Sequence, residues 1–269
     1  MQPLRVNVLG FGVMGRQISA LLGHLGCDVT AWNRTHTPEA KASYDATLRL
    51  TRRKVPVQTP PGRVELVSEL GALEPGVTIE TLSEDLDIKR RVVASLPYDP
   101  LEAALFTNTS SLAPGSILRG ATGLHFFNPV HRLKLVELAP GEGSLSAEGT
   151  RLLDCLAGAG YEVVRTGTNP GYIGNYMLFH EISAVLKLIE LHGYGSDEID
   201  RVSRHLGHAS VLDVIDLIGV EVTLRILEQL HAVDPAFYVS PSLGKAIERN
   251  VLGTRNKTSI RSIIGGKDR

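Results

Sequence analysis

One residue in the middle of the chain could move a proton to or from an oxygen atom. His125 lies near the end of a strand-like run, Gly123–Phe127, and histidine exchanges protons near neutral pH. Ligands of open α/β sheets bind at the edge where the strands end. A lone histidine is more often structural than catalytic, so the neighbours of His125 decide between the two interpretations.

A glycine-rich turn near the amino terminus could hold a phosphate. Gly10, Gly12 and Gly15, with Val13 and Met14 between them, form GxGxxG directly after a strand-like run and before an amphipathic helix. The first glycine permits a tight turn, the second lets the backbone approach a pyrophosphate, and the third allows close packing of helix on strand. The helix amino terminus then stabilises the phosphate charge. The motif predicts a dinucleotide site; the alternative is a tight turn without ligand.

The end of the second strand-like run indicates which dinucleotide is bound. An acid there accepts hydrogen bonds from the ribose of NAD, whereas an arginine accommodates the 2′-phosphate of NADP. This chain has Asn33 and Arg34 and no acid at that place. We expect NADP to be preferred, with NAD still used if Arg34 is only a solvated loop residue.

Strand-like runs alternate with helical patterns through the first part of the chain. Ile18, Leu21, Leu22 and Leu25 fall on one helix face. Such alternation predicts βαβ units and a mainly parallel sheet with helices on both sides. The expected strands are Val6–Leu9, Val29–Trp32, Val64–Val67, Thr78–Leu82, Leu105–Thr107, Gly123–Phe127 and Glu162–Arg165.

The pattern changes after Asn169-Pro170-Gly171, where only helical periodicity remains. The sequence thus predicts an α/β protein in which a Rossmann-type, doubly wound parallel sheet (1–168) precedes an all-helical domain (169–269). The expected helices are Ile173–Leu191, Asp197–Leu206, Val211–Ile218 and Val222–Leu230.

Four linked segments closely resemble the 3-hydroxyacyl-CoA dehydrogenase family, which includes 3-hydroxybutyryl-CoA dehydrogenases. They occur in the family's order, and the resemblance runs from the glycine turn to about residue 257. The segments are NTSSL (108–112), GLHFFNPV (123–130), KLVE (134–137) and PGYIGN (170–175).

The resemblance implies a catalytic set on an L-3-hydroxyacyl or 3-oxoacyl thioester carried by coenzyme A or a carrier protein. His125 is the acid or base, and Glu137 beside it would fix the imidazole tautomer. Ser110 and Asn175 would be polar partners of the substrate oxygen. For Ser110 and Ser111, capping of a helix near Pro114 is an alternative.

The resemblance also assigns cofactor contacts. It places Glu80, Lys89 and Asn108 on the cofactor side of the site, and Arg255 or Lys257 could approach as well. It further implies a homodimer formed through the helical domains.

The chain departs from the family pattern in places that affect the substrate more than the chemistry. The segment between the second strand and Glu80 is shorter than usual. A basic cluster remains there, at Arg49, Arg52, Arg53 and Lys54, and it could meet coenzyme A phosphates or be a solvated helix face.

Two other function classes stay open. β-Hydroxyacid dehydrogenases share such glycine turns, but they use a lysine on the interdomain helix, and here Lys187 comes three turns after Asn175. A non-catalytic dinucleotide-binding relative is the third reading, because fold alone never establishes activity.

Composition and residue spacing argue against several classes of binding partner. Twenty-eight basic and 29 acidic residues give a net charge of −1, which argues against nucleic acid. We expect no metal site, since His131 near His125 has no third ligand at suitable spacing, and no membrane span. The distant cysteines Cys27 and Cys155 lack any pairing motif and indicate reduced thiols and a cytoplasmic location.

Overall fold

The computed structural model describes residues 2–57 and 59–264, and it divides into two compact units, Met1–Tyr172 and Ile173–Arg269. Each unit has its own hydrophobic core. None of the helices in the described part is both long enough and apolar enough to cross a membrane.

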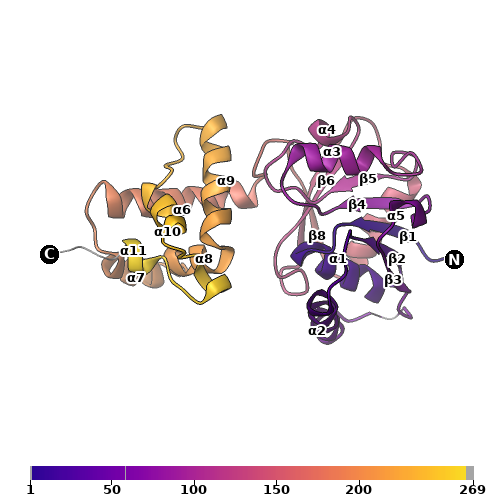
Figure 1. Ribbon diagram of the computed structural model, residues 1–269, viewed down its shortest axis with the longest axis horizontal. Coiled ribbons are helices and arrows are strands. Elements are labelled where there is room, and N and C mark those ends of the chain that lie inside the picture. Colours follow the sequence, from indigo (N-terminus) through magenta and orange to yellow (C-terminus); the bar gives the residue numbers. More distant parts are fainter. Residues whose placement is uncertain (1, 58, 265–269) are drawn as a thin grey trace. The chain divides into compact units, whose positions relative to one another are not determined.

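The first unit is built on one eight-stranded sheet with the strand order β3-β2-β1-β4-β5-β6-β7-β8 (Figure 1). All neighbouring strands run parallel except β6 and β7. The strands are β1 (Arg5–Leu9), β2 (Asp28–Trp32), β3 (Val64–Val67), β4 (Val77–Glu80), β5 (Leu105–Thr107), β6 (Thr122–Phe126), β7 (Leu135–Ala139) and β8 (Glu162–Arg165).

Helices cover both faces of this sheet, and each face has its own core. The larger core joins the sheet to α1, α2 and α5, and the smaller core joins it to α3 and α4. The helices of this unit are α1 (Val13–His24), α2 (Pro38–Lys54), α3 (Leu86–Ala94), α4 (Pro114–Ile117) and α5 (Ala147–Gly158), with a 3₁₀ turn at Leu70–Ala72.

The second unit is helical throughout its described residues. Its core gathers the apolar faces of α6, α8, α9 and α10 around side chains such as Phe179, Leu227 and Phe237. Its helices are α6 (Gly174–Glu190), α7 (Ser196–His205), α8 (Val211–Ile218), α9 (Val220–Val233), α10 (Pro241–Glu248) and α11 (Arg261–Ile264), with a 3₁₀ turn at Gly253–Asn256.

The predicted fold class is confirmed. All seven expected strands occur, with ends that differ by two residues at most, and the four expected helices occur in the second unit. The sequence analysis missed β7, α5, α10 and α11. Strand β7 was missed because its residues were considered only as a motif.

Candidate active site

The centre of the candidate site is a buried pair of side chains on two antiparallel strands. In the register of β6 and β7, His125 lies directly opposite Glu137, so both side chains project from the same face of the sheet. His125 Nδ1 is 2.9 Å from Glu137 Oε2, and the two side chains are 7% and 3% exposed. Because an ionised carboxylate only accepts, Nδ1 donates, and Nε2 is left as the atom that can take up or release a proton.

Two aromatic rings flank the imidazole of His125. The ring of Phe127 lies 4.7 Å away, nearly edge-on, and the ring of Tyr172 lies 5.4 Å away. Tyr172 is buried with a positive φ of 47°, and its hydroxyl has no hydrogen-bond partner among the described residues. Burial raises the pKa of that hydroxyl, with the carboxylates of Glu84 and Glu137 adding to the effect. The aromatic residue of the PGYIGN segment was the sequence signal for this contact.

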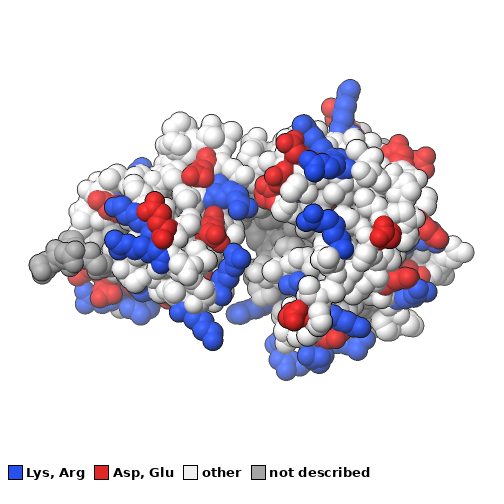
Figure 2. Space-filling view, in the orientation of Figure 1, with Lys and Arg blue, Asp and Glu red and all other residues white. Residues whose placement is uncertain are grey.

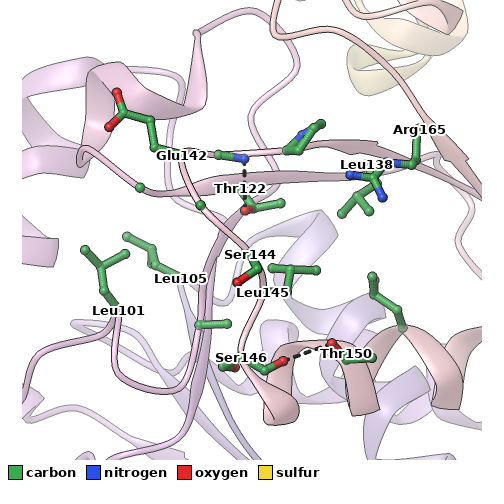
Figure 3. A pocket seen from close by; sticks show the side chains of 16 residues that line it. Leu101, Leu105, Thr122, Leu138, Glu142, Ser144, Leu145, Ser146, Thr150 and Arg165 are labelled. Atoms are coloured by element: carbon green, nitrogen blue, oxygen red, sulfur yellow. Dashed lines mark hydrogen bonds between the residues drawn. The ribbon is translucent and has the colours of Figure 1, made fainter.

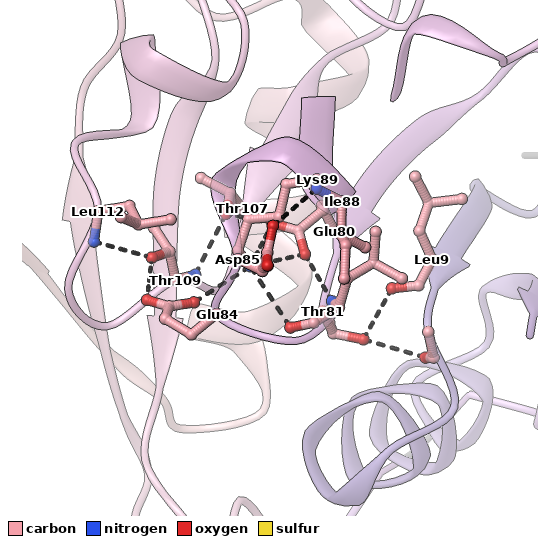
Figure 4. Close-up of polar contacts among 12 residues, drawn as sticks. Leu9, Glu80, Thr81, Glu84, Asp85, Ile88, Lys89, Thr107, Thr109 and Leu112 are labelled. Atoms are coloured by element: carbon pink, nitrogen blue, oxygen red, sulfur yellow. Dashed lines mark hydrogen bonds and ion pairs between the residues drawn. The ribbon is translucent and has the colours of Figure 1, made fainter. Parts of the chain in front are cut away.

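The loop that carries Ser110 is held by a carboxylate that the sequence analysis passed over. Oε1 of Glu84 accepts hydrogen bonds from the backbone N–H of Ser110 (3.0 Å) and of Ser111 (2.9 Å), and from the hydroxyls of Thr109 and Ser111. Figure 4 shows Glu84 reaching the loop from the segment before α3. The loop conformation therefore depends on one acid 26 residues earlier in the chain.

Neither serine caps the following helix. Helix α4 begins at Pro114, its N-cap residue is Ala113, and no side chain makes a capping hydrogen bond at its amino end. The capping alternative for Ser110 and Ser111 is therefore wrong, and the loop is shaped by Glu84 instead.

Glu80 and Lys89 form a buried ion pair. Lys89 Nζ lies 2.8 and 2.9 Å from the two oxygens of Glu80 and 3.2 Å from Glu84 Oε2. Glu80 also accepts from the Thr107 hydroxyl at 2.7 Å, and Glu80 and Lys89 are 0% and 1% exposed. These contacts join β4, β5 and α3 (Figure 4). Their predicted cofactor contact stays a prediction, since the geometry gives them a supporting position.

Asn108 ties the same loop to strand β6. Its Oδ1 accepts from the backbone N–H of Phe126 at 2.9 Å, and its own N–H donates to the carbonyl of Glu80 at 2.8 Å. Asn108 thus fixes the distance between the Ser110 loop and the end of β6. Its predicted contact with the cofactor stays a prediction.

The glycine turn has the backbone that its three glycines imply. Gly10 has φ of 99°, and a Cβ on Gly15 would lie 2.0 Å from the carbonyl oxygen of Gly10. Gly12 has open space around it and, like Val13, is exposed. The Thr81 hydroxyl contacts the carbonyls of Leu9 and Gly10 at 3.0 Å each (Figure 4). The turn is therefore supported on one side by Thr81 and accessible to solvent at Gly12.

Side chains link this turn to the segment after β6 and to the loop after β2. Gln17 on α1 donates to Asn128 Oδ1 and accepts from the backbone N–H of Val130, each at 2.8 Å. Oδ1 of Asn33 accepts from the N–H of Phe11 at 3.3 Å, while Arg34 beside it is exposed. Asn33 therefore shapes the glycine turn, and Arg34 is available to a ligand.

Several predicted residues lie apart from this constellation. Asn175 is in the first turn of α6, in the second unit, and its part in the site stays a prediction. In the same unit Arg255 pairs with Glu221 at 2.8 Å, and Lys257 follows the 3₁₀ turn. The basic cluster of Arg49, Arg52, Arg53 and Lys54 is exposed on α2, and Figure 2 shows Lys and Arg side chains gathered over that helix. Among the described residues, no group of three potential ligands could hold a metal ion.

A cavity of about 490 Å³ lies elsewhere in the first unit (Figure 3). It opens where β5 and β6 begin, and its lining includes Leu101, Leu105, Leu138 and Arg165. The glycine turn and His125 stand at the opposite ends of their strands. The cavity is therefore separate from the candidate active site.

Comparison with known proteins agrees with this arrangement over nearly the whole chain. The family model for the 3-hydroxyacyl-CoA dehydrogenase NAD-binding domain matches residues 5–169, and the model for the C-terminal domain of that enzyme matches residues 171–261. Pig mitochondrial hydroxyacyl-coenzyme A dehydrogenase is 26% identical over 93% of this chain and 88% of its own length.

Two further relatives cover both chains almost completely. The 3-hydroxybutyryl-CoA dehydrogenase of Clostridioides difficile is 26% identical over 94% of this chain and 97% of its own. The crystal structure of (S)-3-hydroxybutyryl-CoA dehydrogenase from Ralstonia eutropha has a TM-score of 0.79 at 20% identity, with 99% and 100% of the two chains covered.

Replacing Glu84 by Gln should lower stability in a pH-dependent way. Burial alone raises the pKa of Glu84, but Lys89 and the hydroxyls of Thr109 and Ser111 outweigh it and lower the pKa below its ordinary value. The carboxylate therefore stabilises the fold above the unfolded pKa of about 4.3, and this contribution is lost as the pH falls through the lower folded value. We expect a loss of about 2 kcal/mol at pH 7, measured by urea unfolding.

The pH series also supplies the control. The difference in unfolding free energy between wild type and Glu84→Gln should become smaller below pH 4. The substitution Glu102→Gln, at an exposed position, should change the unfolding free energy little at any pH. A difference between wild type and Glu84→Gln that stays the same below pH 4 would contradict the proposed role of the Glu84 charge.

Two alanine substitutions in the glycine turn should separate folding from binding. Gly15→Ala forces a clash with the Gly10 carbonyl and should lower the unfolding free energy by roughly 1–3 kcal/mol. Gly12→Ala finds open space and should leave the Tm unchanged while weakening dinucleotide binding. Thermal unfolding and cofactor titration of both variants test this; equal Tm values would refute it.

Proposed function

The chain belongs to the 3-hydroxyacyl-CoA dehydrogenase family, and from that premise we propose how its residues carry out the hydride transfer between a nicotinamide cofactor and C3 of a 3-hydroxyacyl or 3-oxoacyl thioester. The observation that carries the proposal is the His125–Glu137 pair, 2.9 Å apart and nearly enclosed. A polar pair of this kind is costly to bury without a use for it.

The cofactor fits the amino end of α1. Gly12 is open and Gly10 and Gly15 hold the turn, so the backbone N–H groups there would receive the pyrophosphate. When bound, the nicotinamide supplies or accepts the hydride. The residues of this chain bind and orient the cofactor and transfer the proton to or from the substrate oxygen.

Proton transfer falls to His125. In the oxidation direction, Nε2 takes the proton of the 3-hydroxyl as the hydride leaves C3, and Glu137 stabilises the imidazolium that results. In the reduction direction, Nε2 returns that proton to the carbonyl oxygen. Ser110, on the loop fixed by Glu84, would donate a hydrogen bond to the same oxygen, and Asn175 is proposed as a further polar partner of the substrate oxygen.

We further propose that NADPH is the preferred cofactor and that the physiological direction is reduction. The support is Arg34, exposed after β2 where an acid would exclude a 2′-phosphate. The substrate we propose is the L-3-hydroxyacyl form, bound to coenzyme A or a carrier protein.

A homodimer formed through the helical unit is also proposed. The support is that large apolar side chains are exposed on its described surface, among them Met177, Leu206, Leu217 and Val233, each more than 60% accessible, and that a dimer interface would remove such side chains from water. Light scattering after gel filtration would give twice the chain mass. A cytoplasmic location rests on cysteine content alone, and cell fractionation tests it.

Substitutions at the central pair should abolish turnover without releasing the cofactor. With acetoacetyl-CoA and NADPH, His125→Ala should lower kcat by about 10²–10⁴-fold, and Glu137→Gln should lower it by a comparable factor because the tautomer is no longer fixed. Cofactor Kd should stay within about twofold in both. The exposed His192→Ala is the control, and turnover that survives in His125→Ala would refute the mechanism.

Cofactor selectivity should depend on Arg34. Arg34→Ala should lower kcat/KM for NADPH by about 10- to 100-fold, the value of one charge-assisted bond, and leave the value for NADH nearly unchanged. Arg225→Ala, an exposed charge in the second unit, controls for net charge. If the ratio of kcat/KM for NADPH to kcat/KM for NADH is the same in Arg34→Ala as in wild type, the argument for NADPH is wrong.

A further inference from the structure

The only two cysteines of the chain meet in the folded first unit. Cys27 lies in the turn between α1 and β2, and Cys155 lies near the end of α5. Cys155 Sγ lies 3.8 Å from the carbonyl oxygen of Leu25, two residues before Cys27 in the same turn. Cys27 belongs to the larger hydrophobic core of this unit, and Cys155 packs against that core. The two thiols are close enough for each to shift the pKa of the other.

The backbone around Cys27 is firmly held. Its N–H donates to the carbonyl of Leu22 at 3.0 Å, and a Cβ on Gly62 would lie 2.0 Å from the carbonyl oxygen of Cys27. On the other side, Leu152 and Leu156 of α5 are fully buried next to Cys155. The turn that carries Cys27 and the helix that carries Cys155 are thus both held firmly by the core.

The two thiols differ in access and in charge. Cys27 is 1% exposed, whereas Cys155 is only partly buried. The Cys27 thiol, aided by Arg151 one turn earlier, lowers the pKa of Cys155 to about 7, although burial opposes it. The Cys155 thiol and burial raise the pKa of Cys27. Because Cys155 is the more accessible of the two, we assign it as the attacking sulfur and Cys27 as its partner.

We propose that Cys155 and Cys27 form a peroxide-reactive pair that closes to an intramolecular disulfide, with Cys155 as the attacking sulfur and Cys27 as the resolving one. This oxidative modification site lies at the end of the sheet where β2 begins, away from the glycine turn and His125. It is independent of the dehydrogenase reaction.

The step is balanced with hydrogen peroxide as the oxidant. The Cys155 thiolate attacks one peroxide oxygen, the O–O bond breaks, and the leaving hydroxide takes a proton to become water. The thiol of Cys27 then loses its proton and attacks the Cys155 sulfur, an S–S bond forms, and the S–OH oxygen leaves as a second water. Two thiols lose two electrons, and one peroxide gains them.

The full-length reduced protein, treated with a small excess of hydrogen peroxide, tests this directly. The intact mass should fall by about 2 Da, and a non-reducing peptide map should join the peptides that contain residues 27 and 155. The Tm of the first unit should rise by roughly 5–15 °C because a long loop is closed. Dithiothreitol should reverse all three changes, and kcat/KM with acetoacetyl-CoA should not change.

Two variants assign the roles. Cys27→Ser should stop at the sulfenic acid, with a mass gain of about 16 Da that dimedone traps on Cys155, and Cys27→Ala repeats the measurement if serine disturbs the core. Cys155→Ser should not react at the same dose. The proposal is overturned if wild type gains oxygen without a cross-link, if it does not react, or if Cys155→Ser reacts as fast as wild type.

Discussion

The antiparallel pairing of β6 and β7 is the constraint on which the site depends. It places His125 opposite Glu137 on one face of the sheet, and the 2.9 Å contact between them follows without any loop adjustment. A catalytic pair built on two hydrogen-bonded strands is fixed more closely than a pair carried on loops. Asn108 then ties the neighbouring loop to the same strand through the N–H of Phe126.

Around this pair the protein buries more negative than positive charge. Glu80 and Glu84 share the single ammonium of Lys89, so the network would be costly if ion pairing were its only support. The loop that carries Ser110 supplies the rest of the stabilisation of these carboxylates, because its backbone N–H groups and hydroxyls donate hydrogen bonds to Glu84 Oε1. The same hydrogen bonds that make the buried acid tolerable also hold Ser110 in place.

The sequence predicted what is periodic or local, and it missed what depends on distant contacts. The buried strands and the glycine turn have patterns of their own, so both could be located from the residues alone. Glu84 has no such pattern, because its partners are 25 to 27 positions away. Cys27 and Cys155 were taken as unrelated thiols for the same reason, and only the packing of α5 brings them together.

One long-range feature could have been deduced from chain length. Residues 127–134 connect β6 to β7, and a parallel crossover needs roughly a dozen residues or more. The two strands therefore had to run antiparallel. The observed register then places His125, two residues before the connection, opposite Glu137, three residues after it. The short connection therefore implies the antiparallel direction of the two strands, whereas the family resemblance supplied the pairing of these two residues.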